Sequence, residues 1–287
     1  MVRQWSAKPL SSVRIRLSPP KHEITYLTIN KKGVFTIMEN KLVGQLITDP
    51  IEQNRLVAEV KLKPSFKKAI EEIKKLTSFD EDNLNLIHIF QFDTLDENEE
   101  FTLTKVITFE TPDRKVALDA FKVEQGDETF ESFNANVTRA VDGIEIITGI
   151  QVVKGEVGVI FETELEGELA PLTVDLPVIE NYRPGILLDS IEAEAWTDFC
   201  FYWNEKKKYY NHCGKSCGDH GKYGGGSMVN RIDGCCFNHD DCYYRDLKTK
   251  ACCDYSLQRC ASANRDVDYS MYYEIIAYYA KSASGCY

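Results

Sequence analysis

The chain has 287 residues, for which the usual domain size predicts about two domains. Its 45 acidic and 34 basic side chains give a formal net charge of −11, which argues against a general nucleic-acid-binding protein because such a protein needs a basic surface. The hydrophobic fraction of 43% suffices for ordinary folded cores and excludes wholesale disorder.

The first segment, residues 1–37, is basic, with a net charge of +6 and no apolar periodicity. It contains no apolar run of seven or more residues, so no conventional secretory signal peptide is visible. Composition changes at Met38. Two interpretations stay open: a disordered basic arm, or a non-native extension before a true start at Met38.

The next segment is acidic, with a net charge of −15 over residues 38–183. Phe66 to Leu76 has apolar residues at three- and four-residue spacing, which predicts an amphipathic helix. Beyond it the period becomes two, which predicts strands at 86–90, 101–109, 116–123, 144–153 and 157–169. We expect a mainly antiparallel β domain of unknown role at 38–176 and a linker at 177–188, which contains Pro177, Pro184 and Gly185.

All 10 cysteines lie between Cys200 and Cys286, and the opening 199 residues contain none. This density is typical of a disulfide scaffold, so residues 189–287 are expected to form a small disulfide-rich helical domain in an oxidising or extracellular compartment. The predicted fold class is therefore α+β. No stretch approaches 18 apolar residues, so we expect no transmembrane segment.

The run from Asp233 to Tyr243 contains the candidate catalytic histidine and the cysteines expected to fix it. On a helix, Cys235, His239 and Cys242 lie in one row, and Asp240 and Tyr243 lie on a neighbouring row. Adjacent cysteines on a helix point in different directions, so each needs its own partner. Two such disulfides would clamp the helix that holds His239, and a general base needs this fixed geometry.

Asp254 is the candidate partner of that imidazole. A neutral imidazole takes a proton from water with one nitrogen, and its other nitrogen needs an acceptor to fix the tautomer. A carboxylate such as Asp254 serves this purpose. Asp240 follows His239 in sequence and faces elsewhere, where it could bind a hard cation.

Three segments in this order resemble the secreted phospholipase A2 family. The pattern Cys-Cys-x-x-His-Asp-x-Cys-Tyr at 235–243 resembles its active-site helix, and His212 to Gly218 is similar to its calcium loop. The Cys253-Asp254 pair, with Cys260 six residues after the Asp, is similar to its second catalytic helix. The resemblance covers about residues 190–265 and says nothing about residues 38–183.

The resemblance implies a phospholipase A2-type carboxylic ester hydrolase that acts at a phospholipid membrane surface or on micelles. Its calcium-dependent reaction would convert the sn-2 ester of glycerophospholipids into lysophospholipid and fatty acid. By the same resemblance, His239 would be the general base that activates water, Asp254 would orient it, and Tyr243 would hydrogen-bond Asp254.

The implied cofactor is Ca²⁺, held by the carboxylate of Asp240 and by backbone carbonyls of His212, Gly214 and Ser216. The backbone N–H of Gly214 would bind the oxyanion. Ser216 replaces the family's second glycine, and a left-handed backbone at a serine costs on the order of 1–2 kcal/mol.

A second register of the calcium loop stays open, because the segment from Cys217 to Asp233 is longer than the family pattern. In that register the carbonyls would come from Tyr223, Gly224 and Gly226. The first register is preferred because Cys213 then supplies the cysteine that the family has at that point.

The resemblance also implies three disulfides, Cys213–Cys236, Cys235–Cys260 and Cys242–Cys253. Four cysteines then remain, Cys200, Cys217, Cys252 and Cys286, and they allow three connectivities.

Other functions compete with the hydrolase. Cys235, Cys236, His239 and Cys242 could bind zinc. The C-terminal domain could also be a non-catalytic, phospholipase-like toxin or binding module. The acidic domain could regulate the C-terminal domain within the same chain, restraining a lipase until export.

Overall fold

The computed structural model describes residues 27–29, 35–37, 42–96, 100–165, 169, 176–190, 200–203 and 206–286. The chain divides into two compact units, Met1–Glu39 and Asn40–Tyr287. In the first unit, β1 (Leu27–Ile29) and β2 (Phe35–Ile37) pair antiparallel. The rest of the basic segment 1–37 lies outside the described residues, and both interpretations of it stay predictions.

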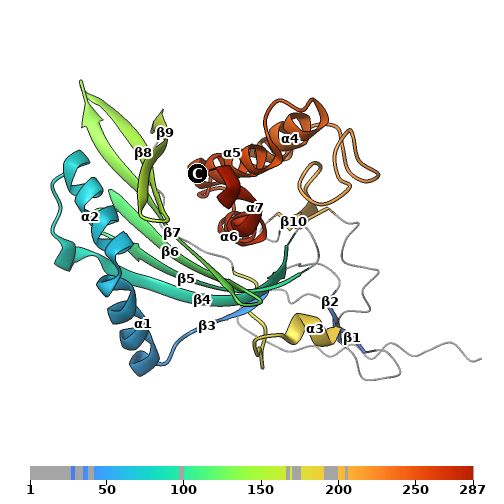
Figure 1. Cartoon of the computed structure of the whole chain (residues 1–287), viewed down its shortest axis with the longest axis horizontal. Helices are drawn as coiled ribbons and strands as arrows, with labels where there is room; N and C mark the ends of the chain where they lie inside the picture. The colour runs from blue at the N-terminus through green and yellow to red at the C-terminus, as the bar shows by residue number, and fades with distance from the viewer. Residues whose placement is uncertain are drawn as a thin grey trace, which may run out of the picture. The chain divides into compact units, whose positions relative to one another are not determined.

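The second unit is built on a seven-stranded antiparallel sheet whose strands follow one another in chain order (Figure 1). The strands are β3 (Val43–Leu46), β4 (Asn85–Leu95), β5 (Phe101–Glu110), β6 (Val116–Gln125), β7 (Glu128–Val141), β8 (Ile144–Val153) and β9 (Glu156–Glu164). Tight turns with positive φ at Asp142-Gly143 and Lys154-Gly155 join the last three strands. The predicted antiparallel sheet is confirmed, and β3 and β7 are additions to it.

Two helices cover one face of the sheet. The first, α1 (Pro50–Leu62), was not predicted, whereas α2 (Pro64–Leu76) matches the amphipathic helix expected at 66–76. The buried face of α2 carries Phe66, Ala69, Ile70 and Ile73, which share a core with alternate residues of the strands. The position of the helix follows from its apolar stripe.

The opposite face of the sheet packs against the C-terminal helices (Figure 1). These are α4 (Arg231–Tyr244), α5 (Lys250–Ala263), α6 (Tyr269–Tyr278) and α7 (Ala280–Ala283). Phe90 and Phe121 of the sheet share one core with Tyr272 and Ile276 of α6. Successive strand residues thus enter two different cores, as the two-residue period of a strand requires. The α+β fold class is confirmed.

The remaining elements are short. They are the helix α3 (Ile186–Ser190), the 3₁₀ turns η1 (Glu81–Asn83) and η2 (Ser284–Cys286), and the antiparallel pair β10 (Tyr202–Trp203) and β11 (Lys208–Tyr209).

The segment expected to be a linker, residues 177–188, is held to the sheet. The N–H of Gly44 in β3 donates to the carbonyl of Pro177 at 3.3 Å, and the N–H of Ile179 donates to the carbonyl of Gly44 at 3.0 Å. The hydroxyl of Tyr182 donates to the buried carboxylate of Asp93 at 2.6 Å. This segment therefore covers one end of β4.

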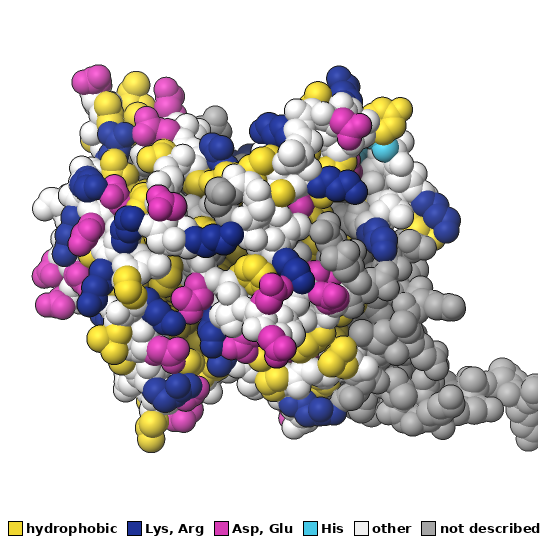
Figure 2. Space-filling view, in the orientation of Figure 1, with side chains coloured by type: hydrophobic (Ala, Val, Ile, Leu, Met, Phe, Trp, Pro, Cys, Tyr) yellow, Lys and Arg dark blue, Asp and Glu magenta, His cyan; other side chains and the backbone are white. Residues whose placement is uncertain are grey.

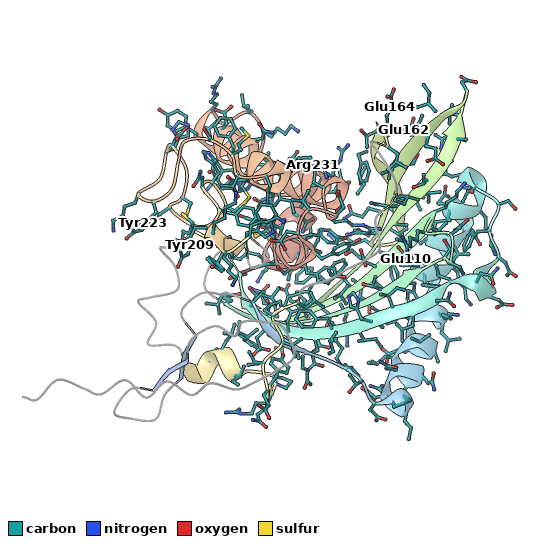
Figure 3. The ribbon with its side chains drawn as sticks, turned by 180° about the vertical axis from the view of Figure 1, so that it is seen from behind. Glu110, Glu162, Glu164, Tyr209, Tyr223 and Arg231 are labelled. Carbon is teal, nitrogen blue, oxygen red and sulfur yellow. A yellow bond between two sulfur atoms is a disulfide. The ribbon has the colours of Figure 1, made fainter. Side chains whose placement is uncertain are left out.

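One face of the second unit is mixed in charge (Figure 2). On the face drawn in Figure 2, Lys and Arg side chains are interspersed with Asp and Glu side chains. Glu162 and Glu164 project from the edge strand β9 (Figure 3), where charged side chains oppose pairing with another strand. Among the described residues, no helix is both long and apolar enough to cross a membrane.

Candidate active site

The helix α4 holds the central histidine and is clamped at three cysteines. Its N-cap is Asn230, whose side chain accepts from the N–H of Asp233 at 2.9 Å. Cys235 and Cys242 bond to Cys260 and Cys253 of α5, so two covalent links hold the helices together. A third link, Cys213–Cys236, ties α4 to the preceding loop.

His239, Asp254 and Tyr243 meet between these two helices. His239 Nε2 lies 2.8 Å from Asp254 Oδ1, and the hydroxyl of Tyr243 donates to the same oxygen at 2.6 Å. Asp254 is fully buried, and the side chain of His239 is only 6% exposed. Because a carboxylate only accepts, Nε2 carries the hydrogen, and Nδ1 is the nitrogen able to take a proton.

The charges around His239 favour its protonated form. Burial lowers the pKa of His239, but the neighbouring carboxylates of Asp240 and Asp254 outweigh it and hold that pKa above its ordinary value. Burial raises the pKa of Asp240, which the adjacent His239 partly offsets. His239 Nδ1 lies 3.8 Å from Asp240 Oδ1, which is too long for a hydrogen bond.

A small cavity of about 30 Å³ adjoins His239. Its polar wall comes from His212, Gly214, His239, Asp240 and Glu274. Its apolar wall comes from Phe201, Leu257, Met271, Ile275, Tyr278 and Tyr279. This volume has room for water but is too small for an acyl chain in this conformation.

Asp233 positions the loop that contributes His212, and the sequence patterns did not single it out. Its buried carboxylate accepts from the backbone N–H groups of His212 at 2.7 Å, Asn211 at 3.2 Å and Val229 at 2.9 Å. An acidic residue in the first turn of a helix is the local signal that could have identified it. Its three acceptor contacts attach the loop to α4.

The first register of the expected calcium loop fits the ion only in part. Asp240 Oδ2 is buried and has no hydrogen-bond partner, so it can serve as an oxygen ligand. The carbonyl of Ser216, however, accepts from the N–H groups of Lys222 at 2.6 Å and Tyr223 at 2.8 Å. Both lone pairs of that oxygen are used, and Ser216 does not line the cavity. Ser216 also has a φ of 64°, so the expected backbone cost is present.

The second register does not fit as a set either. None of Tyr223, Gly224 and Gly226 lines the cavity that Asp240 lines, and the carbonyl of Gly226 already accepts from His212 Nε2 at 2.9 Å. The backbone of Tyr223 is bridged to Cys217, and its side chain lies at the outer edge of this loop (Figure 3). Neither set of three carbonyls is therefore arranged as a complete calcium shell.

The disulfides show how the ten cysteines pair and whether any of them could bind zinc. The three pairings implied by the resemblance are present, and the remaining four cysteines form Cys200–Cys217 and Cys252–Cys286. All ten cysteines are paired, so no thiolate is left to bind zinc, and the zinc alternative is wrong. Five disulfides indicate an oxidising compartment.

No family model, curated protein or solved structure matches this chain. The proposed function therefore rests on the geometry of the site. Of the expected site residues, His239, Asp254 and Tyr243 are in contact, and His212, Gly214 and Asp240 line one cavity with His239.

Proposed function

We propose that this protein hydrolyses the sn-2 ester of glycerophospholipids, releasing lysophospholipid and a fatty acid, at a membrane surface or on micelles. The observation that carries the proposal is the bond from His239 Nε2 to the buried Asp254 at 2.8 Å. It leaves His239 Nδ1 as the only ring nitrogen able to act as a base.

In the proposed reaction a water molecule beside Nδ1 loses a proton to His239, and its oxygen attacks the sn-2 carbonyl carbon. The negative charge that develops on the carbonyl oxygen is stabilised by the backbone N–H of Gly214, which lines the cavity. The C–O bond then breaks, and the proton on His239 passes to the leaving lysophospholipid oxygen. Asp254 stabilises the imidazolium between the two proton transfers.

The small volume of the cavity sets a condition on this reaction. Since about 30 Å³ is too small for an acyl chain, lipid can reach His239 only when side chains that line the cavity move. Tyr279 is one of them, with its ring centroid 5.1 Å from that of His239. The small volume of the cavity also favours the second candidate function, a non-catalytic phospholipase-like binding module or toxin.

The test measures fatty acid released from vesicles whose phospholipids carry different sn-1 and sn-2 chains. It is run with Ca²⁺, with Mn²⁺ and with a chelator, so that hydrolysis is judged apart from the choice of ion. We expect release of the sn-2 chain and a loss of about 10²–10⁴-fold in His239→Gln.

The matched control is His220→Gln, because His220 is exposed and its ring stacks on Tyr244 with centroids 4.0 Å apart. This variant should hydrolyse as well as the wild type. Vesicle binding by the wild type without hydrolysis under any ion condition would favour the non-catalytic module.

A further inference from the structure

His212 is held in one tautomer. Its ring is buried, and its Nε2 lies 2.9 Å from the carbonyl oxygen of Gly226. A carbonyl oxygen only accepts, so the hydrogen of the neutral ring is on Nε2, and Nδ1 presents a lone pair. The ring packs edge-on against Phe237, with centroids 5.1 Å apart, which fixes its orientation.

Two buried acceptors beside Gly218 lack a donor. His212 Nδ1 and Asp240 Oδ2 are both buried without a hydrogen-bond partner. A Cβ placed on Gly218, which has a φ of +92°, would lie 3.0 Å from the first atom and 2.9 Å from the second. Both atoms thus face one point beside Gly218, and both residues line the small cavity next to His239. A buried acceptor without a donor costs about 1–3 kcal/mol, so the space between the two atoms favours an occupant with positive charge.

The donor atoms indicate which occupant fits. A histidine that binds a metal almost always gives its other N–H to a carbonyl or carboxylate, as His212 gives Nε2–H to Gly226. Imidazole nitrogen together with carboxylate oxygen suits transition-metal ions, whereas calcium takes oxygen ligands.

We propose that His212 Nδ1 and Asp240 Oδ2 bind one divalent cation of the class that accepts imidazole nitrogen, such as Mn²⁺ or Zn²⁺. Within the described part of the chain, no three His, Cys, Asp or Glu side chains gather as a metal site. The other coordination positions therefore belong to water or backbone oxygen. The role of the ion in turnover rests on the proposed hydrolysis, but its binding does not.

The experiment measures metal binding by the full chain with its disulfides intact, after treatment with a chelator. Mn²⁺ is titrated in and followed by electron paramagnetic resonance, including the pulsed measurement that detects a coupled ¹⁴N nucleus. We expect bound Mn²⁺ with nitrogen coupling in the wild type. The coupling should disappear and the affinity fall at least tenfold in His212→Gln, while His220→Gln keeps both.

A second variant, Asp240→Asn, guards against misfolding of the first, because the amide has nearly the same shape as the carboxylate. It removes the charged ligand and keeps His212, so it should also weaken Mn²⁺ binding at least tenfold. Variants are compared only where unreduced samples show no free thiols, since all ten cysteines are paired in the folded chain.

Three outcomes would overturn the inference. Mn²⁺ that binds without nitrogen coupling means a shell of oxygens alone. Ca²⁺ that displaces Mn²⁺ at equal concentration contradicts the proposed preference for nitrogen-accepting ions. No binding of Mn²⁺ or Zn²⁺ at millimolar concentration means that the two acceptors share a water molecule or a proton instead. A chain that binds Mn²⁺ through nitrogen yet hydrolyses no lipid would overturn the proposed function alone.

Discussion

Arg265 and Asp119 form an ion pair between the turn before α6 and strand β6, with Nη1 and Oδ2 2.7 Å apart and side chains only 5% and 1% exposed. Asp119 also accepts from the hydroxyl of Thr108 at 2.7 Å, and Arg265 Nη2 lies 3.4 Å from the carbonyl of Ala117. The charges are thus paired inside the contact between sheet and C-terminal helices. The acidic domain shares its interior with the candidate active-site helices.

Removing one member of this pair should destabilise the whole second unit. Arg265→Met leaves the carboxylate of Asp119 buried without its cation, and we expect the free energy of unfolding to fall by about 3–5 kcal/mol. Urea denaturation of the oxidised chain measures it. The double variant Arg265→Met with Asp119→Leu removes both charges and should recover most of the loss. A single variant that costs under about 1 kcal/mol would show that the pair is not buried in solution.

His88 makes the same contact sensitive to pH. Its Nε2 lies 3.0 Å from the hydroxyl of Tyr273, which lies 2.8 Å from that of Thr108. Thr108 gives its hydrogen to Asp119, so Tyr273 donates to Thr108 and His88 donates to Tyr273. Burial lowers the pKa of His88 to about 4, from 6.5.

Because the folded state holds fewer protons on His88 than the unfolded state, stability should fall as the pH drops from about 6.5 to about 4. The loss is at most about 3 kcal/mol, since the ring is partly exposed. Urea denaturation at several pH values measures the slope. His88→Gln should show a shallower slope over this interval, and an unchanged slope would contradict the assignment to His88.

The part of the site on α4 was predictable because its residues are close together in the sequence. The spacing of Cys235, His239 and Cys242 places their side chains on one face of a helix, whatever that helix packs against. The contact with Asp254 could be predicted only with the resemblance as well, because a sequence separation of 15 does not say which carboxylate contacts the imidazole. The roles of both residues stay predictions.

The position of the His212 side chain could not be predicted. The sequence suggested only its backbone carbonyl as a ligand, because loops have no periodicity from which a side-chain direction follows. Its tautomer depends on the carbonyl of Gly226, 14 residues away, and its loop is held by Asp233. Such long-range contacts form only when the loop folds.

Strand β7 and helix α1 were missed for different reasons. Strand β7 carries polar residues such as Glu128, Glu131 and Asn134, which hide its two-residue period, yet it pairs with both neighbours along its length. Helix α1 buries only Leu56, so it lacks the apolar stripe that marks α2. Its N-cap Asp49 followed by Pro50 was the available signal.

Tyr243→Phe tests how Asp254 is oriented. The lost hydroxyl bonds the same carboxylate oxygen as His239, and a hydrogen bond to a charged group contributes about 1.5–3 kcal/mol. If the proposed hydrolysis holds, kcat should fall by about tenfold to a hundredfold with KM little changed. Vesicle hydrolysis measures both constants. Tyr244→Phe is the control, since Tyr244 is exposed and stacks on His220, and an equal loss in both variants would contradict this role.

The disulfide Cys252–Cys286 should have opposite effects on stability and on turnover. It ties the chain end to α5 across a sequence separation of 34, so replacing both cysteines with serine should lower the free energy of unfolding by about 3–4 kcal/mol. The same change loosens the end that follows Tyr279, which lines the small cavity beside His239. Under the proposed function we therefore expect faster vesicle hydrolysis from a less stable protein.

The control is the pair of serine replacements at Cys200 and Cys217, whose separation of 17 predicts a similar loss of about 3 kcal/mol. This disulfide holds the loop before α4, which contributes Phe201, His212 and Gly214 to the cavity wall. Its removal should destabilise the chain and lower turnover rather than raise it, because the proposed oxyanion position at Gly214 becomes less ordered. Urea denaturation and vesicle hydrolysis are measured on both double variants. If both variants lose activity in proportion to stability, the chain end does not limit access to His239, and another part of the cavity wall must open.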